Sequence, residues 1–306
     1  MDLNIIKDIF QKMGNFDWEI ALIKFRETKK NGIEFFCRKI VLDPYDKLSG
    51  LVKDISELYT SDLLENKYQQ VKPYEGSCDA QVIYRLPCSD KLIKDAFEKL
   101  VESISHGDVE EDPFKLKAQA YVIYADLVEE GVAKPIKMIS VKNPTTILKH
   151  KFFADKGSFK ELPEKVLTLR TSIDLVIYDG YVYFFDMSGE KLFALERTYT
   201  IKCRKDAKLI RDSCILSNPD FFYEYAQKGH NPRRFLSFNE GSLESLASKK
   251  IRRRLAKKFG LRIKDDLFVT DTSEEVTQLV KVLCNKGALD PFGEDAMEVT
   301  GMEKWG

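Results

Sequence analysis

The stretch VLTLRTSIDLVIYDGYVYFFDMSGEKLFALERT, residues 166–198, decides the fold. Residues 173–178 and 181–185 are rich in branched and aromatic side chains, as half-buried or buried strands are. Asp179-Gly180, which separates them, is a typical hairpin turn sequence. After the hairpin, Ser188 can cap a helix. The sequence therefore predicts an antiparallel hairpin followed directly by a helix.

The rest of the chain also combines hairpins with amphipathic helices. The sequence predicts one hairpin from the strand-like residues 18–25 and 33–41, which flank a Lys-Lys-Asn-Gly turn. It predicts a second antiparallel pair of strands at residues 118–127 and 136–141. Apolar residues recur at helical spacing in 48–64. Because strands follow strands, we expect an α+β fold of mixed, largely antiparallel sheets of hairpins with packed amphipathic helices. A doubly wound nucleotide fold does not fit this order.

No repeat and no Pro/Gly/Ser-rich linker divides the chain. The weakest junction lies at residues 143–157, where we place a domain boundary. Residues 1–155 then form an N-terminal α+β domain with hairpins, and residues 156–306 form a second α+β domain.

Composition limits the classes of function. The chain has 306 residues, 43% of them hydrophobic, with 49 basic and 49 acidic residues. A neutral protein has no overall field that attracts nucleic acid, so such binding has to come from a local patch. Its apolar runs are too short to span a bilayer, and no signal peptide precedes the first helix. We expect a cytoplasmic protein with reduced cysteines, since the six cysteines contain no CxxC pair.

The strongest local feature is a basic segment near residue 250. Between residues 240 and 264, nine basic and two acidic residues give a local charge of +7. At helical spacing an apolar stripe runs along it, made of Leu243, Ala247, Ile251, Leu255 and Phe259. We expect one helix that packs by this stripe and presents cations, which suits binding to a phosphate backbone. The alternative is a solvated face, or one that neutralises an acidic patch on the same molecule or on a partner.

Two further basic groups are weaker candidates. One follows the hairpin and extends to Arg211, and the other follows His230. The full set of candidate DNA-binding residues is Lys249, Lys250, Arg252, Arg253, Arg254, Lys257, Lys258, Lys202, Arg204, Lys205, Lys208, Arg233 and Arg234.

Catalytic templates fit the chain poorly. The nearest approach to a nuclease metal site is Asp174 followed by Asp186-Met187-Ser188, but Ser188 stands where a lysine would polarise the scissile phosphate. No phosphate-binding glycine loop, dinucleotide motif or nucleophile elbow is present. Helix-turn-helix and zinc-finger patterns are also missing. We therefore assign no catalytic residue, no metal site and no cofactor.

The second half of the chain resembles the KwaB family, the cytosolic subunit of the Kiwa anti-phage defence system. The likeness rests on the Ile-Asp-Leu-Val-Ile and Val-Tyr-Phe-Phe strands, the helix start at Glu190 and the helical arm through Arg211. A second match opens with Asp271-Thr-Ser-Glu-Glu and continues through Gly287-Ala-Leu-Asp-Pro-Phe to Val299. Residues 1–155 match only in overall length.

This resemblance implies a function and partners. It implies binding to phage DNA through this domain, homodimers, and a membrane partner of KwaA type that recruits the protein to the inner membrane. We therefore expect an anti-phage protein that binds DNA non-enzymatically through basic helices. Two alternatives remain open: a metal-dependent nuclease effector, or an interaction or regulatory subunit that does not bind DNA.

Overall fold

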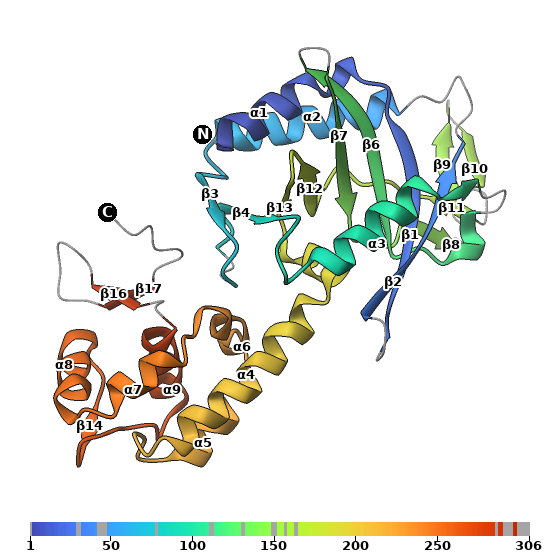
Figure 1. Cartoon of the computed structure of the whole chain (residues 1–306). Helices are drawn as coiled ribbons and strands as arrows, with labels where there is room; N and C mark the ends of the chain where they lie inside the picture. The colour runs from blue at the N-terminus through green and yellow to red at the C-terminus, as the bar shows by residue number, and fades with distance from the viewer. Residues whose placement is uncertain are drawn as a thin grey trace. The chain divides into compact units, whose positions relative to one another are not determined.

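The computed structural model describes residues 2–28, 32–41, 48–76, 79–109, 113–129, 132–147, 152–155, 158–161, 165–284, 287–289 and 296–298 (Figure 1). The chain divides into two compact units. Unit 1 consists of Met1–Lys72 and Ala80–Ala194, and unit 2 consists of Pro73–Asp79 and Leu195–Gly306. The boundary predicted near residue 155 lies inside unit 1.

Unit 1 is a sheet with helices on both faces. Its helices are α1 (Asp2–Lys12), η1 (Met13–Asn15), α2 (Ser49–Leu64), α3 (Lys94–Ser105), η2 (Pro113–Leu116) and η3 (Met187–Phe193). Its strands are β1 (Glu19–Thr28), β2 (Gly32–Ile40), β3 (Gln70–Pro73), β4 (Val82–Pro87), β5 (Asp108–Val109), β6 (Ala120–Glu129), β7 (Val132–Ser140), β8 (Thr145–Ile147), β9 (Phe152–Asp155), β10 (Ser158–Glu161), β11 (Lys165–Leu167), β12 (Leu175–Tyr178) and β13 (Tyr181–Phe184).

Nine strands of the described residues form the main sheet, in the order β3-β4-β13-β12-β7-β6-β1-β2-β5. The predicted hairpins are confirmed: β1 pairs antiparallel with β2, β6 with β7, and β12 with β13. At the β12–β13 turn, Asp179 and Gly180 have φ values of 48° and 77°, as a type I′ turn requires. The α+β fold class is confirmed.

Side chains of one strand alternate between the two faces of this sheet. Leu22 of β1 belongs to the core that α1 and α2 cover, and Figure 1 shows these two helices side by side. Tyr59 of α2 ties this layer to the sheet, because its hydroxyl donates to Ile173 O (2.9 Å) and accepts from Ile173 N (2.7 Å). The opposite face of β2 packs against α3.

The segment after the central hairpin differs from the prediction. Asp186, not Ser188, is the cap, since its Oδ1 accepts from Ser188 N at 2.7 Å. The first turns are the 3-10 helix η3, which ends at Ala194 in a left-handed conformation with φ 48°. The long helix begins only at Leu195. Residues 166–170 alternate apolar and polar side chains, which also indicates a strand. Residues 165–167 form β11, which pairs with β8 outside the main sheet.

Unit 2 is mainly helical. It contains α4 (Leu195–Asp212), α5 (Pro219–Tyr225), α6 (Asn231–Arg234), η4 (Phe235–Ser237), α7 (Gly241–Leu246), α8 (Lys249–Phe259), β14 (Ile263–Lys264), β15 (Leu267–Phe268), α9 (Ser273–Leu283), β16 (Gly287–Leu289) and β17 (Ala296–Glu298). Phe222, Phe235 and Phe268 are fully buried in its core. Thr272 and Glu275 form a capping box at the start of α9. Across the part of the chain that the structure describes, no helix combines the length and apolar content needed to cross a bilayer.

Candidate nucleic-acid interface

The basic segment folds as two helices, not as one. Leu243 lies in α7 and Ile251 in α8, and between them Ser248 adopts an extended conformation with ψ 119°. The predicted stripe is therefore interrupted, although Leu243, Ile251 and Leu255 all pack against the core of unit 2. Gly260 ends α8 in a left-handed conformation with φ 63°. The expectation of a single helix was wrong, because a seventeen-residue periodicity does not reveal a local break at a serine.

One side of α8 is buried and the other side is entirely basic. Arg252, Ala256 and Phe259 are its buried residues. Gln278 of α9 fixes the end of the helix, since its Nε2 donates to Phe259 O at 2.9 Å. The solvent-facing residues, which we term the cationic face, are Lys249, Lys250, Arg253, Arg254, Lys257 and Lys258. No acidic residue occurs within α8.

Arg252 does not belong to this face. Only 6% of its surface is exposed, and its guanidinium donates to three backbone carbonyls. Nη1 reaches Leu246 O (2.5 Å) and Ala247 O (2.9 Å) at the end of α7, while Nε reaches Asp266 O (2.7 Å). Arg252 thus satisfies carbonyls that the break between α7 and α8 leaves without helical partners. We remove it from the proposed contact residues.

Asp266 lies against one edge of the cationic face. Its carboxylate accepts from Arg253 Nε at 2.6 Å and lies 3.2 Å from Lys249 Nζ. These hydrogen bonds, with Arg253 first, lower the pKa of Asp266, so the carboxylate stays charged at neutral pH. Both cations remain mostly exposed, at 71% for Lys249 and 68% for Arg253. Among the described residues, Lys250, Arg254 and Lys257 have no ion-pair partner.

The second basic group, on α4, is largely engaged within unit 2. Lys202 Nζ lies 2.6 Å from the buried Asp206 Oδ2, and Lys205 Nζ lies 2.6 Å from Glu240 Oε1. Arg204 and Lys208 are exposed one helical turn apart. The structure therefore leaves two of these four residues as outward-facing cations of α4.

The third basic group, at α6, is only half-exposed. The Arg233 guanidinium lies over the Tyr199 ring, 5.4 Å from its centroid. Arg234 Nη1 donates to Asn231 Oδ1 at 3.0 Å. Both arginines thus make contacts within unit 2, and we give them less weight than α8.

The two carboxylates considered for a nuclease metal site, those of Asp174 and Asp186, accept hydrogen bonds from backbone N–H groups of unit 1. Asp174 is 2% exposed, and its Oδ2 accepts from Val141 N at 2.5 Å. Burial raises the pKa of Asp174, while hydrogen bonds to Ser188 outweigh partial burial and lower the pKa of Asp186. Within the residues that the structure describes, no three His, Cys, Asp or Glu side chains gather closely enough to hold a metal ion.

Two features of this site were not found from the sequence. Asp266 lies in the turn after β14, at the end of the basic segment. No sequence pattern indicates that it pairs with Arg253. One sequence feature could have indicated that Arg252 is buried. At helical spacing Arg252 lies beside Leu255 and Phe259, on the apolar side of α8.

Comparison with known proteins identifies the family. The family model described as "Kiwa protein KwaB-like" matches residues 117–287, more than half of the chain. The chain belongs to this KwaB-like family. The membership indicates a role in Kiwa anti-phage defence, in a system with other subunits. No curated protein and no solved structure matches the chain.

The KwaB-like match covers both units. It begins before β6 in unit 1 and extends through α9 to Gly287 in unit 2, so it contains the β12–β13 hairpin and all of α8. The family assignment therefore applies to the part of the chain that carries the cationic face.

Proposed function

We propose that this KwaB-like chain binds the phosphate backbone of phage DNA through the cationic face of α8, without cleaving it. The observation that carries the proposal is that the whole solvent-facing side of α8 is basic, within a protein of zero net charge. Like charges at i,i+4 oppose an isolated helix, and a polyanion relieves that repulsion. Each phosphate contact also releases counterions.

The spacing of the outward cations supports a backbone contact. Lys250, Arg254 and Lys257 follow one another by four and three residues, so they share one line along α8. From the first to the last, the helix rises by about 10 Å, a length over which one DNA strand carries about three phosphates. Such a row contacts phosphates and does not distinguish one base sequence from another.

The test measures DNA binding by fluorescence anisotropy over a salt series. The variant carries Lys250→Glu, Arg254→Glu and Lys257→Glu, none of which has an ion-pair partner among the described residues. We expect affinity for duplex and single-stranded DNA to fall about a hundredfold or more, and the salt slope to decrease by about 0.9 per lost contact on duplex. Mg²⁺ in the assay reveals any cleavage.

The matched control has the same charge change on exposed residues of unit 1, with Lys53→Glu, Lys91→Glu and Lys94→Glu. It should retain wild-type DNA affinity. Equal losses in both variants would mean that only net charge matters, and unchanged affinity in the α8 variant would contradict the assignment. Cut DNA would support the nuclease alternative.

The proposed context is a complex at the inner membrane. We infer that a membrane subunit of KwaA type recruits this chain, which acts there as a homodimer, because the family belongs to a multi-subunit system. The experiment is co-expression with a candidate membrane partner, followed by membrane flotation and light scattering. Recovery of the chain with membranes only when the partner is present supports recruitment, and a monomeric mass contradicts the dimer.

A further inference from the structure

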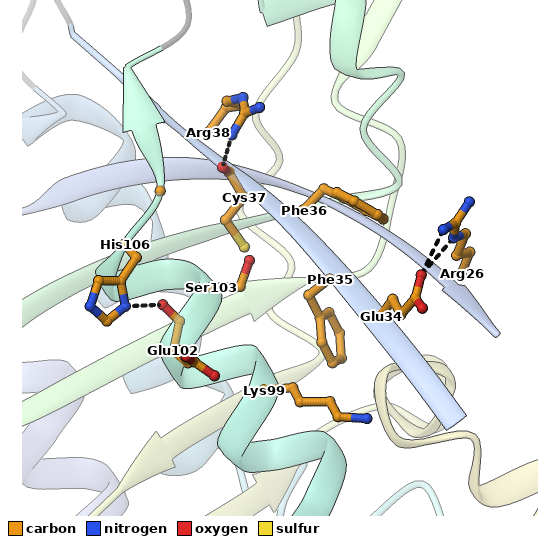
Figure 2. Close-up of a pocket in the computed structure, with 11 residues that line it drawn as sticks. Arg26, Glu34, Phe35, Phe36, Cys37, Arg38, Lys99, Glu102, Ser103 and His106 are labelled. Carbon is orange, nitrogen blue, oxygen red and sulfur yellow. Dashed lines mark hydrogen bonds and ion pairs between the residues drawn. The ribbon is translucent and has the colours of Figure 1, made fainter. Parts of the chain in front are cut away.

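Two arginines line a hollow between β2 and α3 of unit 1, and both have carboxylate partners. The hollow has a volume of about 540 Å³. Figure 2 shows the ion pair of Arg26 with Glu34 at one side of it. Arg38 Nη1 lies 3.2 Å from Asp108 Oδ2. Since these charges are already paired, they do not indicate a ligand.

Unit 2 contains a carboxylate whose burial is compensated only in part. Asp206, on α4, is 1% exposed. Its Oδ2 accepts from Lys202 Nζ at 2.6 Å, whereas Oδ1 is buried and accepts no hydrogen bond from any of the described residues. A buried polar atom normally has a hydrogen-bond partner, because burial without one costs free energy. Asp206 is therefore a buried anion that depends on a single cation.

The titratable and charged groups around Asp206 come from α4 and from the segment before α7. Lys202 and Lys205 lie on α4 itself, and Glu240 approaches from that segment. Cys203, also on α4, donates to Ala226 O at 3.4 Å. Helices α5, α6 and η4 also pack against α4, and the charged residues of α5 and α6 have other interactions: Asp220 with Arg211, Glu224 with Lys228, Arg233 with Tyr199 and Arg234 with Asn231.

Lys202 connects Asp206 to the start of α7. Its ammonium also donates to Phe238 O at 3.3 Å and lies over the Phe238 ring, 5.9 Å from the centroid. Lys205 makes a second link, with Nζ 2.6 Å from Glu240 Oε1, but both of these side chains are exposed and such a pair contributes little by itself. Phe238 and Glu240 lie directly before α7. Lys202 thus makes the more buried of the two contacts that hold this start.

Helix α7 depends on such contacts because it is short. It has six residues, too few for a helix to be stable on its own. Its first turn closes where Leu243 N donates to Glu240 O at 3.0 Å. Its last carbonyls are bound by Arg252. If Lys202 left Phe238 O, α7 would stay fixed at its end and become loose at its start.

The charge on Asp206 decides whether Lys202 stays in place. Burial raises the pKa of Asp206, and the hydrogen bond from Lys202 offsets part of that rise. If Lys202 leaves while Asp206 remains buried, this offset is lost. Asp206 then binds a proton more tightly in the released state than in the held state. Acidification therefore favours release.

This release differs from acid unfolding of the whole unit. Because the pKa of Asp206 is raised, the folded chain binds this proton more tightly than the unfolded chain does. The stability that the proton contributes is complete below the ordinary pKa of an aspartate, and it is lost as the pH rises through the raised pKa. Protonation of Asp206 thus loosens one contact without itself unfolding unit 2.

We propose that Asp206 and Lys202 form a proton-operated latch that holds the start of α7. While Asp206 is charged, Lys202 stays between its carboxylate and Phe238 O, and α7 is complete. When Oδ1 takes up a proton, Asp206 becomes a neutral acid and the ion pair is lost. Lys202, which is already 32% exposed, then turns to solvent, and the first turn of α7 opens. The latch works within unit 2 and does not depend on DNA binding.

The first experiment measures amide hydrogen exchange in the full chain over a pH series, with each rate divided by its intrinsic rate at that pH. On acidification the Leu243 amide should lose protection about tenfold or more, since a hydrogen bond from a charged group is lost. The Val276 amide, which donates to Thr272 O in α9, should keep its protection. Equal loss at both amides would mean that the whole unit opens and would overturn the proposal.

The second experiment removes the charge of Asp206. In Asp206→Asn the Leu243 amide should be poorly protected at every pH, and its pH dependence should disappear. Glu240→Gln is the control, because it removes a neighbouring carboxylate whose pKa is lowered and not raised. It should retain the pH dependence of wild type. Wild-type protection in Asp206→Asn, or a pH dependence that persists in it, contradicts the latch.

Variants of Lys202 keep the test valid if Asp206→Asn does not fold. Lys202→Met should expose the Leu243 amide at neutral pH, and Lys202→Arg, which keeps the charge, should restore protection. Lys208→Met, at an exposed lysine of the same helix, should behave as wild type. Carbon NMR of the Asp206 carboxyl adds a readout that a merely structural role would not change. Its pKa should be higher in Lys202→Met than in wild type, and equal values would overturn the proposal.

Discussion

Arg252 shows how one residue of a basic run can have a structural role. Its guanidinium bonds three backbone carbonyls, two of them at the end of α7, so it joins α7, α8 and the Asp266 turn. We expect Arg252→Met to lower the free energy of unfolding by about 2 to 4 kcal/mol, because the buried carbonyls lose their donors. Thermal and denaturant unfolding measure this effect.

The control for Arg252→Met is Arg254→Met, because Arg254 is an exposed residue on the same helix. It should change stability by no more than about 0.5 kcal/mol while weakening DNA binding, the reverse of Arg252→Met. If Arg252→Met is as stable as wild type, the carbonyl contacts do not hold the helices together.

The sequence predicted that the run is basic, but it could not show which guanidinium is buried, since that depends on where α7 ends.

At the scale of elements, the turn between β14 and β15 limits the cationic face of α8. Asp266 in this turn has φ 66° and holds Lys249 and Arg253. Because this carboxylate competes with phosphate for the two cations, Asp266→Asn should raise DNA affinity about two- to fivefold at low salt. Its lowered pKa means that mild acidification to pH 6 should not reproduce the effect.

Asp265→Asn is the matched control for this turn. Asp265 is exposed and also has a positive φ, of 52°, but no ion pair is formed by it among the described residues. It should change DNA affinity less than Asp266→Asn does. Weaker binding in Asp266→Asn would mean that Asp266 positions the two cations for phosphate and does not compete with it. Anisotropy titrations on both variants measure the difference.

Individual elements were predicted best where the signal is local. The β12–β13 hairpin followed from Asp179-Gly180, because this pair accepts two positive φ values. The pairing of β11 with β8 could not be predicted, since alternation in residues 166–170 does not specify a partner strand.

At the scale of the whole molecule, unit 2 includes a short segment that lies within the sequence of unit 1, and sequence alone does not reveal this. Pro73–Asp79 begins at the last residue of β3 but belongs to unit 2, where Ser237 Oγ donates to Glu75 O at 3.3 Å. A domain boundary predicted from composition assumes that each domain is continuous. Neighbouring residues carry no local signal of such a long-range contact.

This arrangement gives the last prediction, made for Gly76. Gly76 has φ +76°, and a Cβ there would lie closer to Arg233 O than real Cβ atoms do. Gly76→Ala should therefore destabilise unit 2 by about 1 to 3 kcal/mol and speed amide exchange in α6. Gly229→Ala separates the two causes, because Gly229 also has a positive φ, of +60°, but nothing lies within 4 Å of its Cβ position. Since only Gly76→Ala adds a steric conflict with Arg233, its loss of stability should exceed that of Gly229→Ala. Equal losses in thermal unfolding would mean that Gly76 does not pack against Arg233 of α6 in solution.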